Sequence, residues 1–369
     1  HKRIPDDISV NPTIIGHEFS GIIIDAGDKW KHKFKKGQKF SIQPAMAHTG
    51  TLNAPGYSFS YIGGDATYII IPDLVMEADC LLPYDGEAFF PASLSEPMSC
   101  IIGAFNASYH IPPGTYKHEM GIRKGGRIAI LAGVGPMGLG AIDYAIHQER
   151  KPELLVVTDI DDYRLIRAAS LFTPENAEKE GVKLVYVNTE DIPDPVRYLK
   201  DLSGGTGYDD VFVFAPVKEV VEQGDAILGT DGCLNFFSGP SDPEFRAEMN
   251  FYNVHYAFTH IAGTSGGNTD DMRESLRLMS AGKINPAVMI THIGGLDSVV
   301  NTTLNLPDIP GGKKLIYTNI SLPLISLYDL GEMGKKDPFY ADLHWLVSKN
   351  NFIWSFEAEK YLLANAEPI

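Results

Sequence analysis

Cysteine is scarce in this sequence of 369 residues, which contains only Cys80, Cys100 and Cys233. No two of them are close in the sequence, so a zinc site of four thiolates is excluded and a disulfide framework is not indicated. This cysteine content is typical of proteins in a reducing cytoplasm, where we expect this protein to reside. The chain begins with His1 rather than methionine, and we expect further residues upstream of it.

Long apolar runs and an excess of basic residues are missing as well. The most apolar segments, 154–160 and 209–216, contain charged residues or proline well before the roughly 18 residues that a membrane span requires. The chain has 31 Lys and Arg against 47 Asp and Glu, a formal net charge of −16, so its average surface repels nucleic acid and anionic lipid. We therefore expect no nucleic-acid partner and no membrane association, and an anionic substrate would need a local group of cations.

The remaining composition is that of a globular α/β protein. Hydrophobic residues make up 44% of the chain and charged residues 21%, which is ordinary for a folded protein. Because a single core rarely grows beyond about 250 to 300 residues, we predict two domains. Changes in the sequence pattern assign 1–105 to the first domain, 106–285 to the second, and 286–369 to a return to the first domain with a helical C-terminal tail.

The segment 106–285 alternates between short apolar strand patterns and helical patterns. Strands are predicted over 127–133, 154–159, 183–188, 209–216, 232–239 and 260–267. Such alternation implies an α/β fold with a doubly wound parallel sheet of the Rossmann type. The first domain is predicted to be mostly β, with strands near 22–24, 37–45 and 66–72 and a loop region at 43–65.

A glycine-rich motif directly follows the first predicted strand of the parallel sheet. Its six residues are Gly133, Val134, Gly135, Pro136, Met137 and Gly138. With a strand before it and a helix after it, this spacing permits a tight turn, close approach of a pyrophosphate and close packing of helix on strand. The motif predicts a dinucleotide site, and a glycine turn without a ligand is the alternative.

The acidic residue that accompanies such a motif is Asp159, at the end of the next predicted strand. A carboxylate at this place accepts hydrogen bonds from ribose hydroxyls and repels a 2′-phosphate. Asp159 therefore favours NAD(H) over NADP(H). NADP(H) stays open as the second choice, because Arg164 follows closely enough to reach a phosphate.

A second motif lies near the start of the chain, where His17 and Glu18 are neighbours between Gly16 and Gly21. Imidazole and carboxylate are suitable ligands for a catalytic zinc. Glu96, followed by a proline, is a further carboxylate ahead of the glycine-rich motif. Taken singly, His17 would be a buried histidine and the two glutamates solvated or capping residues. The flanking glycines and the nucleotide motif downstream make these single interpretations improbable.

The pattern Gly16-His17-Glu18-x-x-Gly21-x5-Gly27, with the glycine-rich motif after it, resembles the zinc-containing medium-chain dehydrogenase/reductase family and its polyol dehydrogenase branch. The resemblance covers nearly the whole chain and implies a GroES-like catalytic domain. It also implies that Zn²⁺ is bound by His17, by Glu18 or Glu96, and by a cysteine that would precede His1. Glu18 and Glu96 are thus the candidate catalytic residues. Segment 43–65 lacks the four cysteines of a structural zinc, so we expect at most one metal per subunit.

The resemblance further implies hydride transfer between a nicotinamide cofactor and a phosphorylated ketose or polyol, in a homo-oligomer of two or four subunits. Alternatives stay open, namely another polyol such as sorbitol or galactitol 1-phosphate, and a nucleotide-binding protein without catalysis. Lys2 and Arg3 are candidates for binding a substrate phosphate, but solvated loop charges are the better interpretation of both. Four histidines without ligand spacing are interpreted as structural: His110, His118, His255 and His260.

Overall fold

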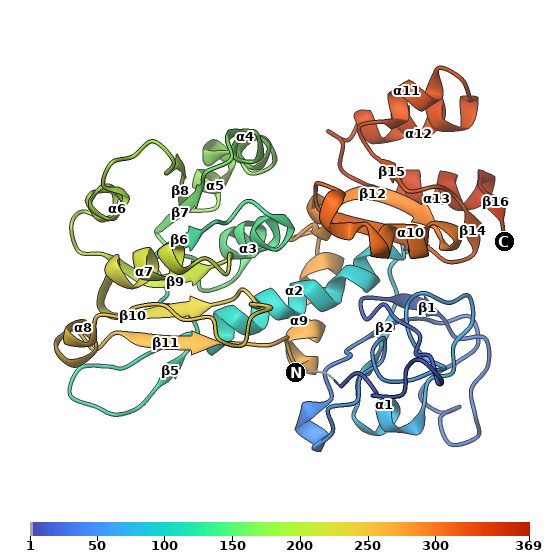
Figure 1. Cartoon of the computed structure of the whole chain (residues 1–369), viewed down its shortest axis with the longest axis horizontal. Coiled ribbons are helices and arrows are strands. Elements are labelled where there is room, and N and C mark those ends of the chain that lie inside the picture. The colour runs from blue at the N-terminus through green and yellow to red at the C-terminus, as the bar shows by residue number, and fades with distance from the viewer. Residues whose placement is uncertain (1–2) are drawn as a thin grey trace. The chain divides into compact units, whose positions relative to one another are not determined.

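The computed structural model describes residues 3–369, which form two compact units (Figure 1). One unit extends to Ser99 and resumes at Asn268–Ile369, and the other is Cys100–Gly267. The chain passes from one unit to the other after residues 99 and 267. The sequence pattern predicts these boundaries after residues 105 and 285. Lys2 lies outside the described residues. Over 3–369, no helix combines the length and the apolarity that crossing a bilayer takes.

The unit Cys100–Gly267 is built on a six-stranded sheet with the order β11-β10-β9-β6-β7-β8, and all neighbouring strands run parallel. Its strands are β6 (Arg127–Leu131), β7 (Leu154–Asp159), β8 (Lys183–Asn188), β9 (Tyr208–Val213), β10 (Leu228–Phe236) and β11 (His260–Gly263), and an antiparallel pair is formed by β4 (Tyr109–His110) and β5 (Glu119–Met120). The chain reverses its direction of winding between β6 and β9. This confirms the predicted doubly wound sheet, and such sheets bind nucleotides at the carboxyl ends of the strands where the winding reverses.

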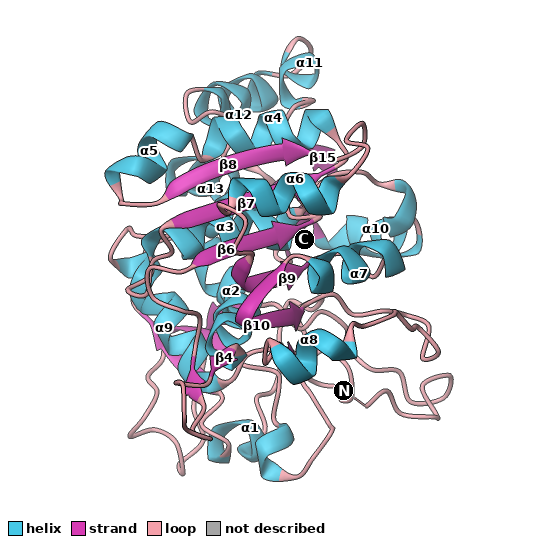
Figure 2. Cartoon of the chain, turned by 90° about the vertical axis from the view of Figure 1, so that its left-hand side faces the viewer, coloured by secondary structure: helices cyan, strands magenta, loops and turns pink. Residues whose placement is uncertain are grey.

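Helices cover both faces of this sheet (Figure 2). Successive side chains of a strand point to opposite faces, as two residues of β9 illustrate. Val211 packs with Leu199 and Val221, whereas Phe212 stacks on Phe105 at a ring centroid distance of 4.3 Å. The helices of this part are α2 (Phe90–Ala107), α3 (Pro136–His147), α4 (Asp162–Leu171), α5 (Pro174–Lys179), α6 (Pro195–Leu202), α7 (Lys218–Ala226) and α8 (Phe251–Tyr256). One face thus receives α6 and α7, and the other receives the C-terminal part of α2.

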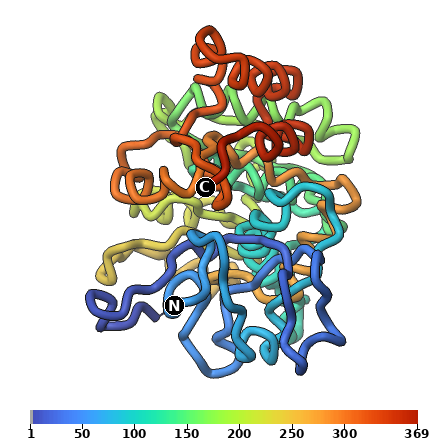
Figure 3. Tube along the Cα trace, turned by 90° about the vertical axis from the view of Figure 1, so that its right-hand side faces the viewer, coloured from blue at the N-terminus to red at the C-terminus, as the bar shows by residue number. Residues whose placement is uncertain are grey.

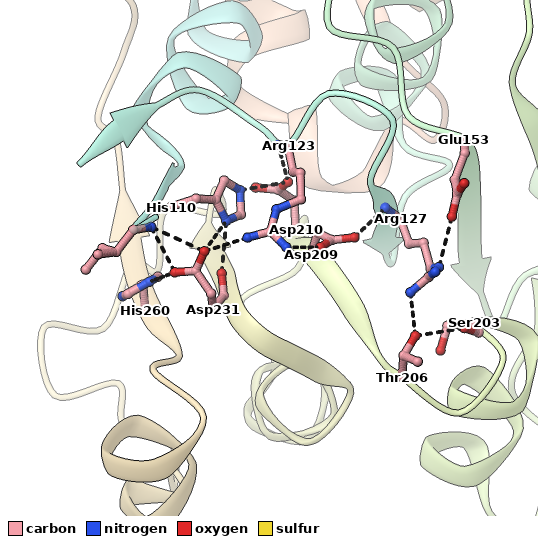
Figure 4. Close-up of polar contacts among 11 residues, drawn as sticks. His110, Arg123, Arg127, Glu153, Ser203, Thr206, Asp209, Asp210, Asp231 and His260 are labelled. Carbon is pink, nitrogen blue, oxygen red and sulfur yellow. Dashed lines mark hydrogen bonds and ion pairs between the residues drawn. The ribbon is translucent and has the colours of Figure 1, made fainter. Parts of the chain in front are cut away.

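A network of charged side chains lies toward the amino ends of β9, β10 and β11 (Figure 4). One carboxylate oxygen of Asp231 lies 2.5 Å from Nη2 of Arg123, and the other lies 2.7 Å from Nε2 of His260. His110 donates from Nδ1 to the carbonyl oxygen of Asp231 at 2.9 Å, and its Nε2 lies 3.3 Å from the buried carboxylate of Asp210. His110 and His260 are therefore both parts of one polar core.

The described part of the other unit contains two three-stranded sheets and the antiparallel pair of β14 (Ile320–Ser321) and β16 (Glu367–Pro368). The first is antiparallel and consists of β1 (Ser20–Ile22), β2 (Lys39–Ile42) and β3 (Leu81–Tyr84). The predicted strand over 66–72 is wrong, because these residues form no strand. Tyr68 and Ile70 are 78% and 68% exposed, so their side chains do not pack on a neighbouring strand. Strand propensity depends on that packing, and the apolar composition of this segment was a misleading signal.

The C-terminal part of this unit, orange to red in Figure 3, supplies its second three-stranded sheet and most of its helices. Its strands are β12 (Ile290–Gly295), β13 (Lys313–Tyr317), β14 (Ile320–Ser321), β15 (Ile325–Ser326) and β16 (Glu367–Pro368), and the sheet order is β13-β12-β15. The helices of the unit besides the first part of α2 are α1 (Asp73–Glu77), α9 (Thr269–Ser280), α10 (Val299–Leu304), α11 (Leu330–Gly334), α12 (Pro338–Ser348) and α13 (Phe356–Asn365). The predicted helical tail therefore consists of three helices.

The tail is anchored by a buried core rather than by one amphipathic face. Leu343, Trp354 and Leu362 are at most 1% exposed and join the apolar cluster around β12 and β13. The carboxylate of Glu359 accepts hydrogen bonds from the N–H groups of Phe89 and Phe90 at 2.6 and 3.0 Å. Helix α13 thus holds the start of α2, the helix that carries Glu96.

Candidate metal and nucleotide sites

The backbone ahead of β1 carries the first half of the predicted metal site, and a glycine fixes its conformation. Gly16 has a φ angle of +87°, which residues with a side chain rarely adopt. Its carbonyl oxygen accepts a hydrogen bond of 2.6 Å from the N–H of Gly64. This close contact holds the turn that presents His17 and Glu18 immediately before the strand.

The structure brings His17 and Glu18 together with Glu96, which lies 3% exposed in the helix α2. One ligand atom from each of the three residues lies within 4.8 Å of the others. The three residues predicted from the sequence thus form one cluster, although Glu96 is far from the other two along the chain. None of the three cysteines belongs to this cluster among the residues that the structure describes.

The donor atoms of this cluster suit a divalent cation. Two carboxylates so close to each other repel, and a mostly buried one such as Glu96 has little water to screen it. A cation bound between the two carboxylates would offset their electrostatic repulsion. An imidazole nitrogen and carboxylate oxygens are ligands that zinc accepts at 2.0 to 2.2 Å in catalytic sites, as a general property of the metal. The residues present therefore fit a zinc ion, with His17, Glu18 and Glu96 as the candidates to hold it.

Two neighbours of the cluster were missed in the sequence. Tyr57 lies with its hydroxyl 3.4 Å from Nε2 of His17, and the two rings are 4.8 Å apart. Lys313, in β13, forms an ion pair with the carboxylate of Glu18. Neither residue stands in a motif, and Lys313 follows Glu18 by 295 positions. No local pattern could have connected them.

A cavity of about 910 Å³ opens beside the cluster. His17, Glu18 and Lys313 line it, together with mainly aliphatic and aromatic side chains from segments 19–40, 68–81 and 89–94 and from β13. Asp65 lies on its wall, and burial raises the pKa of that carboxyl to about 6. The cavity is large enough for a sugar-sized ligand, since small-molecule pockets commonly measure roughly 300 to 1,000 Å³.

The glycine-rich motif lies between β6 and α3 in the other unit, and its glycines have different surroundings. A Cβ atom at Gly138 would lie 2.1 Å from the carbonyl oxygen of Gly133, so the helix and the loop touch there. A Cβ atom at Gly135 would meet nothing within 4 Å. Gly135 is also the N-cap of α3, with Pro136 at the first helical position. The loop thus offers open space directly at a helix N-terminus, where a phosphate binds favourably.

Asp159 ends β7 and faces the same loop. One of its carboxylate oxygens lies 3.4 Å from the N–H of Val134, and the other accepts hydrogen bonds from the N–H groups of Ile160 and Asp161. Val134 is 4% exposed and Met137 is half-buried, so the space beside the loop is bounded mainly by backbone. Arg164 pairs with Asp161 at 3.3 Å, which places its guanidinium on its own helix.

Replacing Gly138 with alanine is expected to weaken NADH binding roughly tenfold, since a methyl group forced into a tight contact costs about 1 to 3 kcal/mol. The helix would have to move away from Gly133, and its N-terminal amides would move with it. Titration of NADH fluorescence with the full chain measures the effect. Gly239→Ala, at an open position with no neighbour within 4 Å, is the control. Unchanged NADH affinity in Gly138→Ala would contradict the assignment of this loop.

Comparison with known proteins identifies a family and relatives for this chain. Residues 136–281 match the zinc-binding dehydrogenase family. The mannitol-1-phosphate 5-dehydrogenase of Aliivibrio fischeri is 54% identical over 98% of this chain and 86% of its own length. The L-sorbose 1-phosphate reductase of Klebsiella pneumoniae is 49% identical over 100% of this chain and 87% of its own. The 2R,3R-butanediol dehydrogenase structure from Bacillus subtilis shares the fold with a TM-score of 0.66, at 20% identity over 86% of this chain and 84% of its own.

Proposed function

Since this chain belongs to the zinc-dependent medium-chain dehydrogenase/reductase family, we propose that it reduces L-sorbose 1-phosphate to D-glucitol 6-phosphate. It is an oxidoreductase of the zinc-type alcohol and polyol dehydrogenase class, with zinc and a nicotinamide dinucleotide as cofactors. The observation that supports the proposal most is the convergence of His17, Glu18 and Glu96 within 4.8 Å of one another. Two of these residues also line the cavity in which a sugar would bind.

The proposed roles of these residues follow from their chemistry. Zinc held by His17 and the two glutamates would polarise the ketone at C2 as a Lewis acid. Glu96 is buried and fixed in a helix, so it would hold its position during turnover. Glu18 shares its charge with Lys313, and it would act as a ligand or as an acceptor for a proton near the substrate oxygen. A substrate bound against the apolar part of the cavity wall would displace water, which would strengthen the electrostatic interactions there.

The cofactor is proposed to bind at the loop Gly133–Gly138. Its pyrophosphate would lie at the N-terminus of α3, next to Gly135, and the nicotinamide ring would supply the hydride. Asp159 would accept hydrogen bonds from the ribose hydroxyls. NAD(H) is therefore the proposed cofactor, with NADP(H) second.

A second substrate is favoured by the 54% identity to a mannitol-1-phosphate 5-dehydrogenase. The two reactions differ in one respect that matters for the site. In L-sorbose 1-phosphate, the carbonyl carbon is bonded to the carbon that carries the phosphate. Oxidation of mannitol 1-phosphate at C5 gives D-fructose 6-phosphate, in which three carbons separate the carbonyl carbon from the phosphate-bearing carbon. A single pocket would bind these ketoses with the phosphate in different places.

Substrate profiling tests the proposal. Oxidation of NADH and of NADPH is followed by absorbance with L-sorbose 1-phosphate, D-fructose 6-phosphate and unphosphorylated L-sorbose, before and after a zinc chelator. We expect turnover with the first sugar, little with the third, and loss of activity on chelation. If D-fructose 6-phosphate were turned over faster, it would be the preferred substrate in place of L-sorbose 1-phosphate. If activity persisted after the chelator had removed the zinc, the proposed role of the cluster would be wrong. The homo-oligomer stays a prediction, for which sedimentation of the full chain is the measurement.

A further inference from the structure

We propose that Lys313 binds the phosphate group of the substrate, and that it selects ketoses in which the phosphate-bearing carbon adjoins the carbonyl carbon. This inference rests on the proposed function, because it assigns the recognition of the phosphate within the same cavity. The sequence offered Lys2 and Arg3 for this role. Lys2 lies outside the described residues, and Arg3 is exposed and does not line the cavity.

The charge of the cavity wall singles out two lysines. A phosphate dianion needs cationic partners, and the protein as a whole carries a net charge of −16. Among the described residues that line the cavity, Lys313 and Lys314 are the ones that carry an ammonium group. Both belong to β13, and their side chains alternate along the strand. The two lysines are therefore the candidates, and their contacts separate them.

Lys314 uses its ammonium group to hold its own loop. Its Nζ donates to the carbonyl oxygens of Ile309, Pro310 and Gly312 at 3.1, 3.4 and 2.8 Å. These three acceptors match the three donors of an ammonium group. A phosphate at Lys314 would have to displace them, so this lysine has a structural role.

Lys313 has donors left for a ligand. Within 3–369, its Nζ contacts the carboxylate of Glu18, and one such contact leaves two of the three N–H donors of an ammonium. Its side chain is 22% exposed and that of Glu18 is 25% exposed. Both lie on the cavity wall. A phosphate oxygen could thus accept from Lys313 while the ammonium keeps its ion pair.

The position of Lys313 next to the cluster sets the kind of substrate. Glu18 contacts Lys313 and is one of the three residues whose ligand atoms lie within 4.8 Å of one another. A carbonyl group at the cluster and a phosphate at Lys313 would then be held by neighbouring residues. A 1-phosphate of a 2-ketose meets this requirement, because its carbonyl carbon is bonded to the carbon that carries the phosphate. A 6-phosphate would have to fold its carbon chain back on itself, which costs conformational entropy.

The test compares Lys313→Gln with Lys313→Arg and the matched control Lys314→Gln, in the full chain loaded with zinc. For each variant, kcat/KM is measured with L-sorbose 1-phosphate and with L-sorbose, and the ratio of the two values is taken. The ratio cancels any change at the cluster, because both sugars need it. A hydrogen bond to a charged group contributes enough for a change of roughly 10- to 100-fold. We expect Lys313→Gln to lower the ratio by that factor, with Lys313→Arg near the wild type and Lys314→Gln unchanged.

The outcomes separate this inference from the proposed function. If the wild-type protein shows no preference for the phosphorylated sugar, the proposed function fails. If it shows the preference and Lys313→Gln retains it, the inference on Lys313 is wrong. A higher KM for NADH in Lys313→Gln, with an unchanged sugar ratio, would assign this lysine to the cofactor instead. Zinc content and thermal midpoint of each variant confirm that the comparison is made between folded, metal-loaded proteins.

Discussion

His17→Ala is expected to lose bound zinc and to lower the turnover number by about 10³-fold or more, since a metal that stabilises developing charge contributes several kcal/mol. His17 is the single imidazole of the cluster, so its removal leaves two carboxylates without a nitrogen ligand. The hydrogen-bonded turn at Gly16 does not involve the imidazole, and the fold should persist. Metal analysis and steady-state rates after dialysis against limiting zinc measure both effects.

The control is His48→Ala, the same substitution at an exposed position of the same unit. It should keep both zinc and activity. NADH affinity provides a second control, because the glycine-rich loop lies in the other unit. If His17→Ala retains zinc at the wild-type level, the cluster is not the metal site. Loss of zinc without loss of turnover would separate the metal from the reaction.

Glu96→Gln and Glu18→Gln distinguish the two carboxylates. Glu96 is 3% exposed and lies within α2, so an amide there removes a buried negative charge from the cluster. The carboxylate of Glu18 already forms an ion pair with the ammonium group of Lys313. We expect Glu96→Gln to weaken zinc binding more strongly than Glu18→Gln. An equal loss in both variants would show that the two carboxylates contribute alike.

The sequence predicted the nucleotide loop well because all its determinants are local. The glycines at 133, 135 and 138 and the flanking apolar strand lie within a dozen residues, and each glycine has a contact or an opening that explains it. The parallel direction of the strands followed from the alternation of patterns, since parallel strands need crossover helices. By contrast, the apolar run at 66–72 has the composition of a strand but finds no partner strand.

The metal cluster was only partly predictable. His17 and Glu18 are adjacent, and the resemblance supplied Glu96. The ion pair between Glu18 and Lys313 joins residues that are 295 positions apart, and the pairing of β13 with β12 that positions Lys313 is decided by tertiary packing. Charge alone does not mark Lys313, because it stands beside Lys314 with the same side chain. Their difference in contacts arises from the loop at 309–312, whose carbonyl groups accept hydrogen bonds from the ammonium of Lys314.

Asp231→Ala is expected to lower the free energy of unfolding of its unit by about 3 to 5 kcal/mol, the usual cost of removing one partner from a buried ionic network. Its carboxylate contacts both Arg123 and His260 and accepts from the N–H of Ile111 at 2.9 Å. Asp231 also has a φ angle of 58°, which alanine adopts less readily than aspartate or asparagine. Asp231→Asn therefore separates the loss of charge from the backbone strain. Asp201→Ala, at an exposed position of α6, is the matched control.

The same network makes the stability of this unit depend on pH through His110. Burial by itself lowers the pKa of His110. The hydrogen bond and ion pair with Asp210, and the hydrogen bond to the carbonyl oxygen of Asp231, have a larger opposite effect. The pKa of His110 is therefore raised above the ordinary 6.5. A raised pKa in the folded state means that protonation stabilises the fold. This contribution is complete below about pH 6.5 and is lost as the pH rises through the folded-state pKa.

Thermal midpoints measured between pH 5 and 9 test this prediction, with His110→Gln as the comparison. The wild-type protein should lose its advantage over His110→Gln as the pH rises through the raised pKa, because the neutral imidazole can donate from only one of its two nitrogens. Asp231→Ala removes a carboxylate that lies 3.5 Å from Nδ1 of His110, so the pH dependence should weaken in that variant too. A difference between wild type and His110→Gln that stays constant with pH would show that His110 acts through packing alone, and that its charge contributes nothing to the network.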